Sequence, residues 1–330
     1  MSIPIKPLSL RVAVARLLNP LIREFRLRAD NGAALPGFSA GSHIRVQVTL
    51  ADGSRDWRHY SLINFSTAAD ATASPDEYVI AVRKEESGRG GSRFMHEGVA
   101  EGDLMSIEPP ISQFLVGTHA DAAVLVAGGI GITPLTAMAA HRRAAGAPVR
   151  MTYAGRSREL MAYLPELQTL LGSDLTVHVD SEADQPLDVA ALLDACGPAD
   201  ELYVCGPGVM LDAVQRAAES CGWPRERVHF EVFAPASHVA GDQAFELVLS
   251  QTGTTLTVPA DKTILQCLID TGCDPMFDCQ RGECGVCAVP VIEGDLDHRD
   301  HVLTQTEKDG GKVIQVCVSR AKGARLVLDL

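Results

Sequence analysis

Residues 279–287 read Cys-Gln-Arg-Gly-Glu-Cys-Gly-Val-Cys, and this stretch decides what the C-terminal quarter of the chain can fold into. Its cysteines are spaced C-x4-C-x2-C, and a fourth follows after a strand-length segment, which is the spacing of plant-type 2Fe-2S ferredoxins. Gly282 and Gly285 let backbone N–H groups approach the sulfur atoms without a side chain in the way. The stretch predicts an α+β, β-grasp ferredoxin domain with four cluster ligands: Cys279, Cys284, Cys287 and Cys317.

Other interpretations of the cysteines are weaker. A four-cysteine zinc site normally uses two separated C-x2-C pairs and lacks the x4 arm. Cys267 lies in an apolar helical run and Cys273 just after it, so we expect both to be packed thiols. Nine cysteines is an odd number, and without a secretory segment a disulfide framework is not expected.

Upstream of the cysteines, short buried strands alternate with helix-length amphipathic segments. The expected strands are 123–127, 149–153, 175–179 and 202–204. Strands alternating with helices predict a parallel sheet covered by helices, an α/β domain. Closer to the N-terminus, apolar residues alternate in short runs, as in 10–14, 44–48 and 78–82, separated by turn residues. That pattern predicts an antiparallel β-barrel or sandwich.

The chain is therefore expected to be multidomain. The predicted organisation is an antiparallel β-barrel domain at 1–115, an α/β parallel-sheet domain at 116–233, a linker at 234–243 and the ferredoxin domain at 244–330. Within the last domain we expect a strand pair at 245–249 and 255–258, followed by a helix over 263–270.

Two small-residue turns in the α/β domain indicate a nucleotide site. Gly128, Gly129 and Gly131 follow the strand 123–127 and lead into a helix, so bare backbone amides and a helix N-terminus would face a pyrophosphate. Cys205-Gly206-Pro207 makes a second turn of this kind, and two such turns at the carboxyl edge of one parallel sheet form a nucleotide crevice. Glycines also end strands for purely structural reasons, which is the alternative.

Two further residues bear on the nucleotide. Cys205 is either a packed hydrophobe or part of the reaction site. Asp180 ends a strand, where it would accept a ribose hydroxyl and repel a 2′-phosphate, although Arg156 and Arg158 favour the opposite choice. The balance predicts NADH rather than NADPH.

The barrel carries two motifs. Arg58 and Tyr60 share a face of one strand, so one can meet a phosphate while the other stacks on a ring. Ser92 follows Gly90 and Gly91 and precedes the helical run 93–99, which makes it a natural N-cap and the glycines a phosphate site. Each motif alone also fits an ordinary strand or capped loop, whereas together they favour a flavin.

Charge and hydropathy exclude other classes. The net charge of −13 argues against a nucleic-acid surface, which needs a concentrated positive field. No run of 18 apolar residues and no signal-peptide pattern is found in the sequence, so we expect a cytoplasmic protein.

These residues closely resemble the phthalate dioxygenase reductase family, which includes vanillate demethylase reductases. The resemblance runs nearly end to end, through the motifs RHYSL, AVRKEESGRGGS, LVAGGIGITP, YVCGPG, VHFEVF, CGVC, DHRDHVL and VCVSRAKGARLVLDL. It implies FMN in the barrel, a pyridine nucleotide in the middle domain and the cluster at the C-terminus. The absence of an added adenine-binding segment beside GRGGS favours FMN over FAD.

By the same resemblance, the flavin would be lined by Arg58, Tyr60, Ser61, Ala81, Val82, Arg83, Gly90, Gly91, Ser92 and Thr133. Ser61 would lie near the reactive N5 edge, and we name it with Cys205 as a predicted catalytic residue. Phe233 resembles the family's aromatic close to the flavin. Val232 replaces a small polar residue often found there, and His59 stands where threonine is common.

The implied activity is a transfer of electrons. A nicotinamide gives up two electrons as a hydride, whereas an iron-sulfur cluster accepts one, so a flavin is needed to split the pair. The expected partner is a terminal Rieske-type oxygenase. The alternatives are a reductase for a cytochrome P450 or another acceptor, and a non-enzymatic iron-sulfur and nucleotide-binding module.

Overall fold

A computed structural model describes residues 6–68, 71–86, 88, 90–117, 121–233 and 239–330. The chain folds into two compact units. The first runs to Gly206 and includes Pro224–His229, and the second comprises Pro207–Trp223 and Phe230–Leu330. Among the described residues, no helix combines the length and the apolar character needed to cross a membrane.

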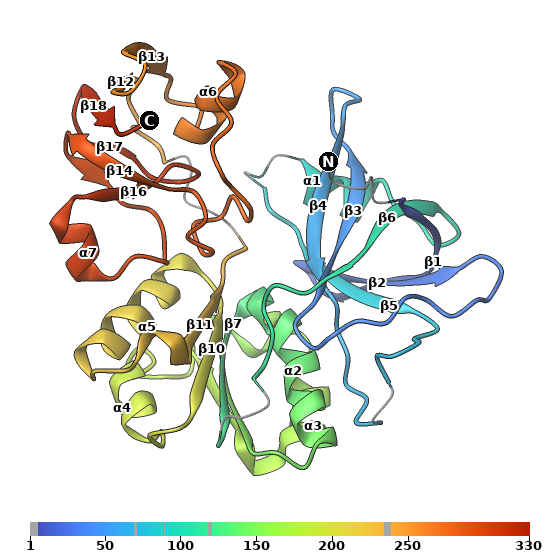
Figure 1. Ribbon diagram of the computed structural model, residues 1–330. Coiled ribbons are helices and arrows are strands. Elements are labelled where there is room, and N and C mark those ends of the chain that lie inside the picture. The colour runs from blue at the N-terminus through green and yellow to red at the C-terminus, as the bar shows by residue number, and fades with distance from the viewer. Residues whose placement is uncertain (1–5, 69–70, 87, 89, 118–120, 234–238) are drawn as a thin grey trace. The chain divides into compact units, whose positions relative to one another are not determined.

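The N-terminal part of the first unit is a six-stranded antiparallel sheet (Figure 1). Its strands are β1 (Leu8–Asn19), β2 (Ile22–Ala29), β3 (His43–Thr49), β4 (Arg55–Ser61), β5 (Tyr78–Arg83) and β6 (Leu104–Ile111), in the order β4-β3-β6-β1-β2-β5. Alternate residues are buried, as Ile44, Val46 and Val48 of β3 show. The antiparallel prediction is confirmed, and closure of this sheet into a barrel stays a prediction.

The second part of this unit is a parallel sheet, as expected. Its strands are β7 (Ala123–Gly128), β8 (Val149–Gly155), β9 (Leu175–Val179), β10 (Glu201–Cys205) and β11 (Val228–Glu231), in the order β11-β10-β7-β8-β9. The helices are α2 (Ile132–Ala144), α3 (Leu164–Leu171) and α4 (Val189–Asp194), with 3-10 turns η1 (Gly129–Gly131), η2 (Arg158–Leu160), η3 (Gly172–Asp174) and η4 (Arg225–Arg227). The strand order reverses between β7 and β10, which is where such sheets bind ligands.

The antiparallel sheet has an apolar core of its own, and a second apolar core joins it to the parallel-sheet part. Ile22 and Ala81 of the antiparallel sheet belong to the same cluster of buried side chains as Leu125 and Met138 of the parallel-sheet part. A hydrogen bond also joins the two parts, because the Tyr163 hydroxyl donates to Glu24 Oε2 of β2 at 2.8 Å. Tyr163 has a positive φ of 62°, a conformation uncommon for a residue other than glycine.

The second unit contains α5 (Gly208–Ser220) and a mixed sheet with its own core. The strands are β12 (Phe245–Leu249), β13 (Thr254–Val258), β14 (Ala288–Glu293), β16 (Val313–Gln315) and β18 (Arg325–Leu328), in the order β13-β12-β18-β14-β16, beside the short pair β15 (Leu296–Asp297) and β17 (Arg320–Ala321). The helices are α6 (Ile264–Asp270) and α7 (Gln305–Gly310). Thr263 and Gln266 form a capping box, so α6 begins where the sequence predicts.

Candidate functional site

The strand motif and the glycine loop of the first unit meet in space. Arg58 and Tyr60 alternate with His59 on β4, and a Cβ added to Gly91 would lie 2.6 Å from Arg58 Nε. Gly91 is therefore required for the guanidinium to lie against the start of α1 (Gly91–Glu97). Burial raises the pKa of Tyr60, so its hydroxyl stays neutral beside this cation.

Two buried polar atoms here have no hydrogen-bond partner among the described residues. They are Arg58 Nη2 and Ser61 Oγ, although Arg58 Nη1 is engaged by Asp56 and by the Trp57 carbonyl. Buried polar groups are almost always paired, so unpaired ones in a protein that folds call for an unseen partner. An anionic group at the guanidinium and a polar edge at Ser61 would satisfy both atoms, which fits a flavin mononucleotide.

The expected N-cap is wrong. The helix α1 begins at Gly91, its N-cap is Gly90 with φ 84°, and no side chain caps it. Ser92 Oγ instead accepts the Glu85 N–H at 3.0 Å, which ties the glycine loop to the end of β5. Only glycine adopts that φ without strain, so the N-cap position is occupied by Gly90. Ser92 lies two residues later, inside the first turn of the helix.

The other predicted flavin residues lie in β5 and α2. Ala81 and Val82 are buried, and Arg83 forms an ion pair with Glu85 at 2.5 Å. Thr133 is buried in the first turn of α2, where its Oγ1 donates to the Ile130 carbonyl at 3.0 Å.

The two predicted nucleotide turns are neighbours, as expected. β7 and β10 pair in parallel, with Ala127 opposite Cys205, so both turns leave the same edge of the sheet. A Cβ on Gly131 would lie 2.1 Å from the Cys205 carbonyl oxygen and 2.7 Å from Gly206 N, so only glycine fits there. Gly128 ends β7, Gly129 has φ 56°, and Pro207 directly precedes α5. The backbone around the crevice is thus fixed by glycine.

The residues that bear on nucleotide choice are spread over two strand ends. Cys205 is fully buried in the shared core, a position that suits a packed thiol, and its catalytic role stays a prediction. Asp180 follows β9 with 61% of its side chain exposed, and His178 Nε2 lies 3.3 Å from its carboxylate. Arg158 is engaged by Glu182 at 2.8 Å, so binding of this arginine to a 2′-phosphate would require that ion pair to break.

The four predicted cluster ligands lie in the second unit as two pairs. The thiols of Cys279 and Cys284 lie next to one another, and so do those of Cys287 and Cys317. A 2Fe-2S cluster needs two thiolates for each iron, which matches this pairing. Within the described part of the chain, no three His, Cys, Asp or Glu side chains converge on a single-ion site.

The loop that carries these ligands depends on glycine. Gly282 has φ 77°, and a Cβ there would lie 2.8 Å from Val318 Cγ2 and 3.0 Å from Asp300 Cα. Gly285 also has φ 77°, and the Arg281 N–H donates to Cys279 Sγ at 3.3 Å. A backbone N–H therefore does reach the sulfur of one predicted ligand. Cys267 is buried within α6 as a packed thiol.

A buried charge cluster next to the ligands was not predicted. Glu231, at the end of β11, is fully buried near Arg281, which pairs with Glu283 at 2.5 Å. Burial raises the pKa of Glu231 to about 8, despite the opposing field of Arg281. The Val232 N–H donates to Glu283 Oε2 at 2.7 Å, while Phe233 is exposed. Two charged residues inside the cysteine loop were the only available sequence signal.

Comparison with known families matches both nucleotide and cluster parts. Residues 125–216 match the model for an oxidoreductase NAD-binding domain, and residues 247–322 match the model for a 2Fe-2S iron-sulfur cluster binding domain. Both ranges contain the turns and cysteines described above.

Full-length relatives are similar throughout. Phthalate dioxygenase reductase of Burkholderia cepacia is 38% identical over 327 residues, covering 98% of this chain and 97% of that protein. A heme-dependent oxidative N-demethylase beta subunit of Ectopseudomonas mendocina is 38% identical over 323 residues, covering 98% and 99%. A solved structure described as phthalate dioxygenase reductase, a modular structure for electron transfer from pyridine nucleotides to [2Fe-2S], matches with TM-score 0.70 and 37% identity over 98% of both chains.

Proposed function

The chain belongs to the family of oxygenase and demethylase reductases that includes phthalate dioxygenase reductase, and on that premise we propose that it supplies electrons from NADH to a Rieske-type aromatic oxygenase or O-demethylase. Its relatives are reductase components of multicomponent oxygenase systems, and the chain carries the NAD-binding and 2Fe-2S domains that this activity needs. The Rieske type of the partner and the roles of single residues are the proposal.

The observation that carries the proposal is the pair of unsatisfied buried atoms on β4. Arg58 Nη2 and Ser61 Oγ lie in one strand, and Gly91 keeps the space beside the guanidinium open. In our proposal Arg58 holds the FMN phosphate together with Gly90, Gly91 and Ser92, and Ser61 faces the reactive edge of the ring. FMN, when bound, takes the electron pair of NADH and releases single electrons to the cluster.

The chain's own residues need only bind and orient, because hydride transfer requires no general acid or base. Gly129 and Gly131 expose backbone amides to the pyrophosphate, and Thr133 lies in the first turn of the helix that follows them. Asp180 accepts a ribose hydroxyl, and Glu182 engages Arg158, which favours NADH over NADPH. Cys279, Cys284, Cys287 and Cys317 hold the 2Fe-2S cluster.

A second acceptor class is supported by one comparison. The N-demethylase relative is named for a heme-dependent system, so a heme protein is the alternative partner. The two partners predict different reconstitution results, since only the correct acceptor turns over with this reductase and NADH.

The test is the absorption spectrum of the purified protein before and after anaerobic NADH, with the released flavin identified, followed by reconstitution. We expect FMN, two irons per chain and bleaching by NADH, then turnover with a Rieske oxygenase. Bleaching with NADPH at equal efficiency would contradict the NADH assignment. A visible spectrum that NADH leaves unchanged would instead support a binding module without enzymatic activity.

A further inference from the structure

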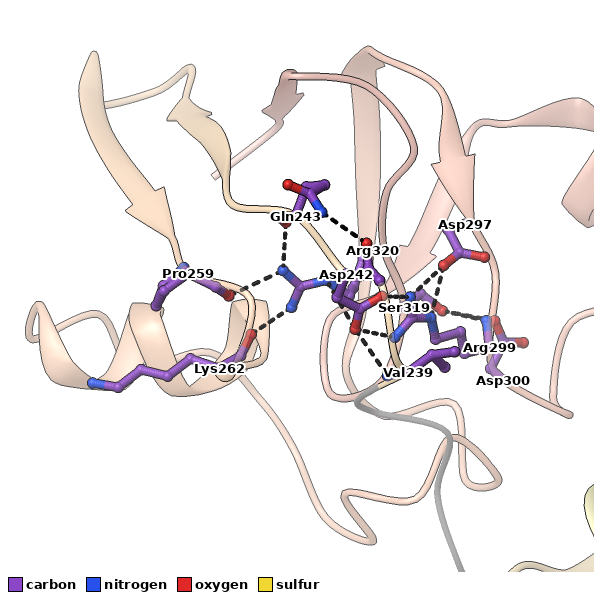
Figure 2. Close-up of polar contacts among 11 residues, drawn as sticks. Val239, Asp242, Gln243, Pro259, Lys262, Asp297, Arg299, Asp300, Ser319 and Arg320 are labelled. Atoms are coloured by element: carbon purple, nitrogen blue, oxygen red, sulfur yellow. Dashed lines mark hydrogen bonds and ion pairs between the residues drawn. The ribbon is translucent and has the colours of Figure 1, made fainter.

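Asp242, near the end of the expected linker, forms an ion pair with Arg299, which lies in the segment before the last predicted cluster ligand, Cys317. Arg299 Nη1 donates to Asp242 Oδ2 at 2.9 Å, and Arg299 Nη2 donates to Oδ1 at 2.5 Å (Figure 2). The two side chains are 8% and 10% exposed. A bidentate pair of this kind fixes direction as well as distance.

A second arginine completes the contact. Arg320 is buried, and its guanidinium donates to the backbone carbonyls of Lys262 at 2.6 Å, Pro259 at 3.0 Å and Gln243 at 3.1 Å (Figure 2). Its Nε lies 3.7 Å from Asp242 Oδ2. Because one planar fork joins the linker end to the turn before α6, a lysine cannot replace it.

This network continues to the cluster ligands. The Arg299 N–H donates to Ser319 Oγ at 3.0 Å, and Ser319 Oγ donates to Asp300 Oδ1 at 3.2 Å. Ser319 is two residues after Cys317, and Asp300 packs against Gly282 of the ligand loop. A displacement of Asp242 would therefore be transmitted to the segments that hold the cluster.

The chain is also held on the other side of residues 234–238. Val232 N donates to Glu283 Oε2 at 2.7 Å, and Glu283 precedes the ligand Cys284. Glu231 lies buried in the field of Arg281, within the same loop. The residues described on each side of 234–238 are thus both attached to ligand-bearing segments.

We propose that Asp242 and Arg299 on one side, and Glu283 through the Val232 amide on the other, are positioning residues for electron delivery to the cluster. This inference rests on the proposed function. The Val232–Glu283 contact fixes the ligand loop relative to the strand end that carries Phe233, the aromatic predicted to lie by the flavin. The Asp242–Arg299 pair fixes Asp242 to the segment before Cys317. A short tether alone gives a high effective concentration but no orientation, whereas transfer depends on both.

A purely stabilising role explains the network less well. A buried ion pair is often no more stabilising than apolar side chains of the same volume, because desolvation offsets the attraction. What the Asp242–Arg299 pair supplies is a defined geometry between its two segments, and the Val232–Glu283 contact does the same for the strand end and the ligand loop.

The test uses the full-length protein with its cofactors and four variants: Asp242→Asn, Arg299→Lys, Glu283→Gln, and Glu246→Gln as control. Glu246 forms an exposed pair with Arg325 in the same part of the chain, so its loss removes an acidic group without touching the network. Anaerobic stopped-flow absorbance with NADH separates flavin reduction from cluster reduction. Hydrogen exchange of residues 239–243 and the spectrum of the reduced cluster are measured on the same samples.

We expect flavin reduction within twofold of the wild type in every variant. Cluster reduction slows about tenfold or more in Asp242→Asn and Arg299→Lys, with a smaller loss in Glu283→Gln and none in Glu246→Gln, since misplacement by about 1 Å costs up to about 100-fold. Exchange at 239–243 rises in the first two variants, while iron content and the cluster spectrum stay unchanged.

Wild-type cluster reduction in Asp242→Asn and Arg299→Lys would overturn the inference. Loss of iron or an altered cluster spectrum in both variants would overturn it too, since the network would then hold the cluster rather than its position. If the wild type itself shows no reduction of flavin by NADH, the proposed function fails instead, which distinguishes the two failures.

Discussion

Each of the two units is assembled from smaller parts, but the contacts between those parts are apolar in the first unit and polar in the second. In the first unit, the antiparallel and parallel sheets meet through shared apolar side chains, and Met138 of α2 lies against Gly41 beside Phe114. In the second unit, α5 and the ferredoxin-like part meet through polar groups. Gln215 donates to the Leu303 carbonyl at 2.9 Å, and Asp212 lies 3.4 Å from His301.

The two kinds of junction suit the two kinds of transfer proposed for them, hydride transfer in the first unit and single-electron transfer in the second. An apolar junction is stabilised by burial over its whole area and has one close-packed arrangement, which suits a hydride transfer that needs two rings in contact. A polar junction rests on a few directional contacts, each contributing about 1 kcal/mol, so it is easier to displace. Single electrons tolerate such a junction provided that a few residues set its geometry.

The largest expected effect comes from removing a cluster ligand. Cys284→Ser should keep NADH-driven flavin reduction and lose at least about 100-fold in cytochrome c reduction, because the route after the flavin is cut. Anaerobic absorbance and a cytochrome c assay measure the two steps separately. Cys273→Ser, outside the ligand set, is the matched control. Unimpaired cytochrome c reduction in the cluster-free variant would refute this order of transfer.

The apolar junction is broken at its centre by Met138→Ala. Met138 is fully buried, so we expect a loss of about 2–5 kcal/mol in the first unit, from lost transfer energy and a new cavity. Hydrogen exchange should speed up in the first unit only. Met276→Ala is the control, since that side chain is 79% exposed. Equal destabilisation of both units would show that the two junctions are not independent.

The flavin cradle is tested by Gly91→Ala. The added Cβ would lie 2.6 Å from Arg58 Nε, so the guanidinium must move away from the proposed phosphate site. We expect about tenfold weaker FMN retention, measured by flavin content after dialysis and by titration of the stripped protein. Gly310→Ala, with open space around it, should bind FMN like the wild type. Equal affinity in both variants would count against Arg58 as the phosphate ligand.

The smallest expected effect is a pH dependence from the buried carboxyl of Glu231, which lies beside the cysteine loop. Burial raises the pKa of Glu231 to about 8 from its ordinary 4.5, with Arg281 and Glu283 facing it. The folded state therefore binds this proton more tightly than the unfolded chain. The stability that it contributes is complete below about pH 4.5 and is lost as the pH rises to about 8.

Glu231→Gln should remove this slope. We expect the wild-type melting temperature to fall by a few degrees between about pH 6 and about pH 8.5 relative to the variant. Calorimetry of the cofactor-loaded proteins measures it, with Glu246→Gln as an exposed control that keeps the wild-type curve. Parallel curves for wild type and Glu231→Gln would show that the buried carboxyl does not titrate in this range.

Local patterns predicted most of the architecture. The strands at 175–179 and 245–249 begin and end where alternation and turn residues indicate, because period and burial are local properties. Cysteine spacing likewise indicated a 2Fe-2S domain, which the family match over residues 247–322 confirms, while the four individual ligands stay a prediction. The N-cap assignment at Ser92 failed because the φ of Gly90 decides where that helix begins.

Local patterns could not predict which side chains far apart in the sequence contact one another. Nothing in β4 indicates that Arg58 would lie on Gly91, and nothing in the linker indicates that Asp242 would find Arg299. These contacts depend on the folded topology, which brings segments far apart in sequence together. The sequence identifies the chemical groups, and the fold decides which of them meet.

The account is tested most directly by the rate of cluster reduction after mixing with NADH without oxygen, measured over about a hundredfold range of protein concentration. Delivery within one chain predicts flavin reduction first and then cluster reduction at a rate independent of protein concentration. A cluster-reduction rate that rises in proportion to concentration would mean that electrons pass between molecules, and would contradict the geometry proposed for Val232 and Asp242.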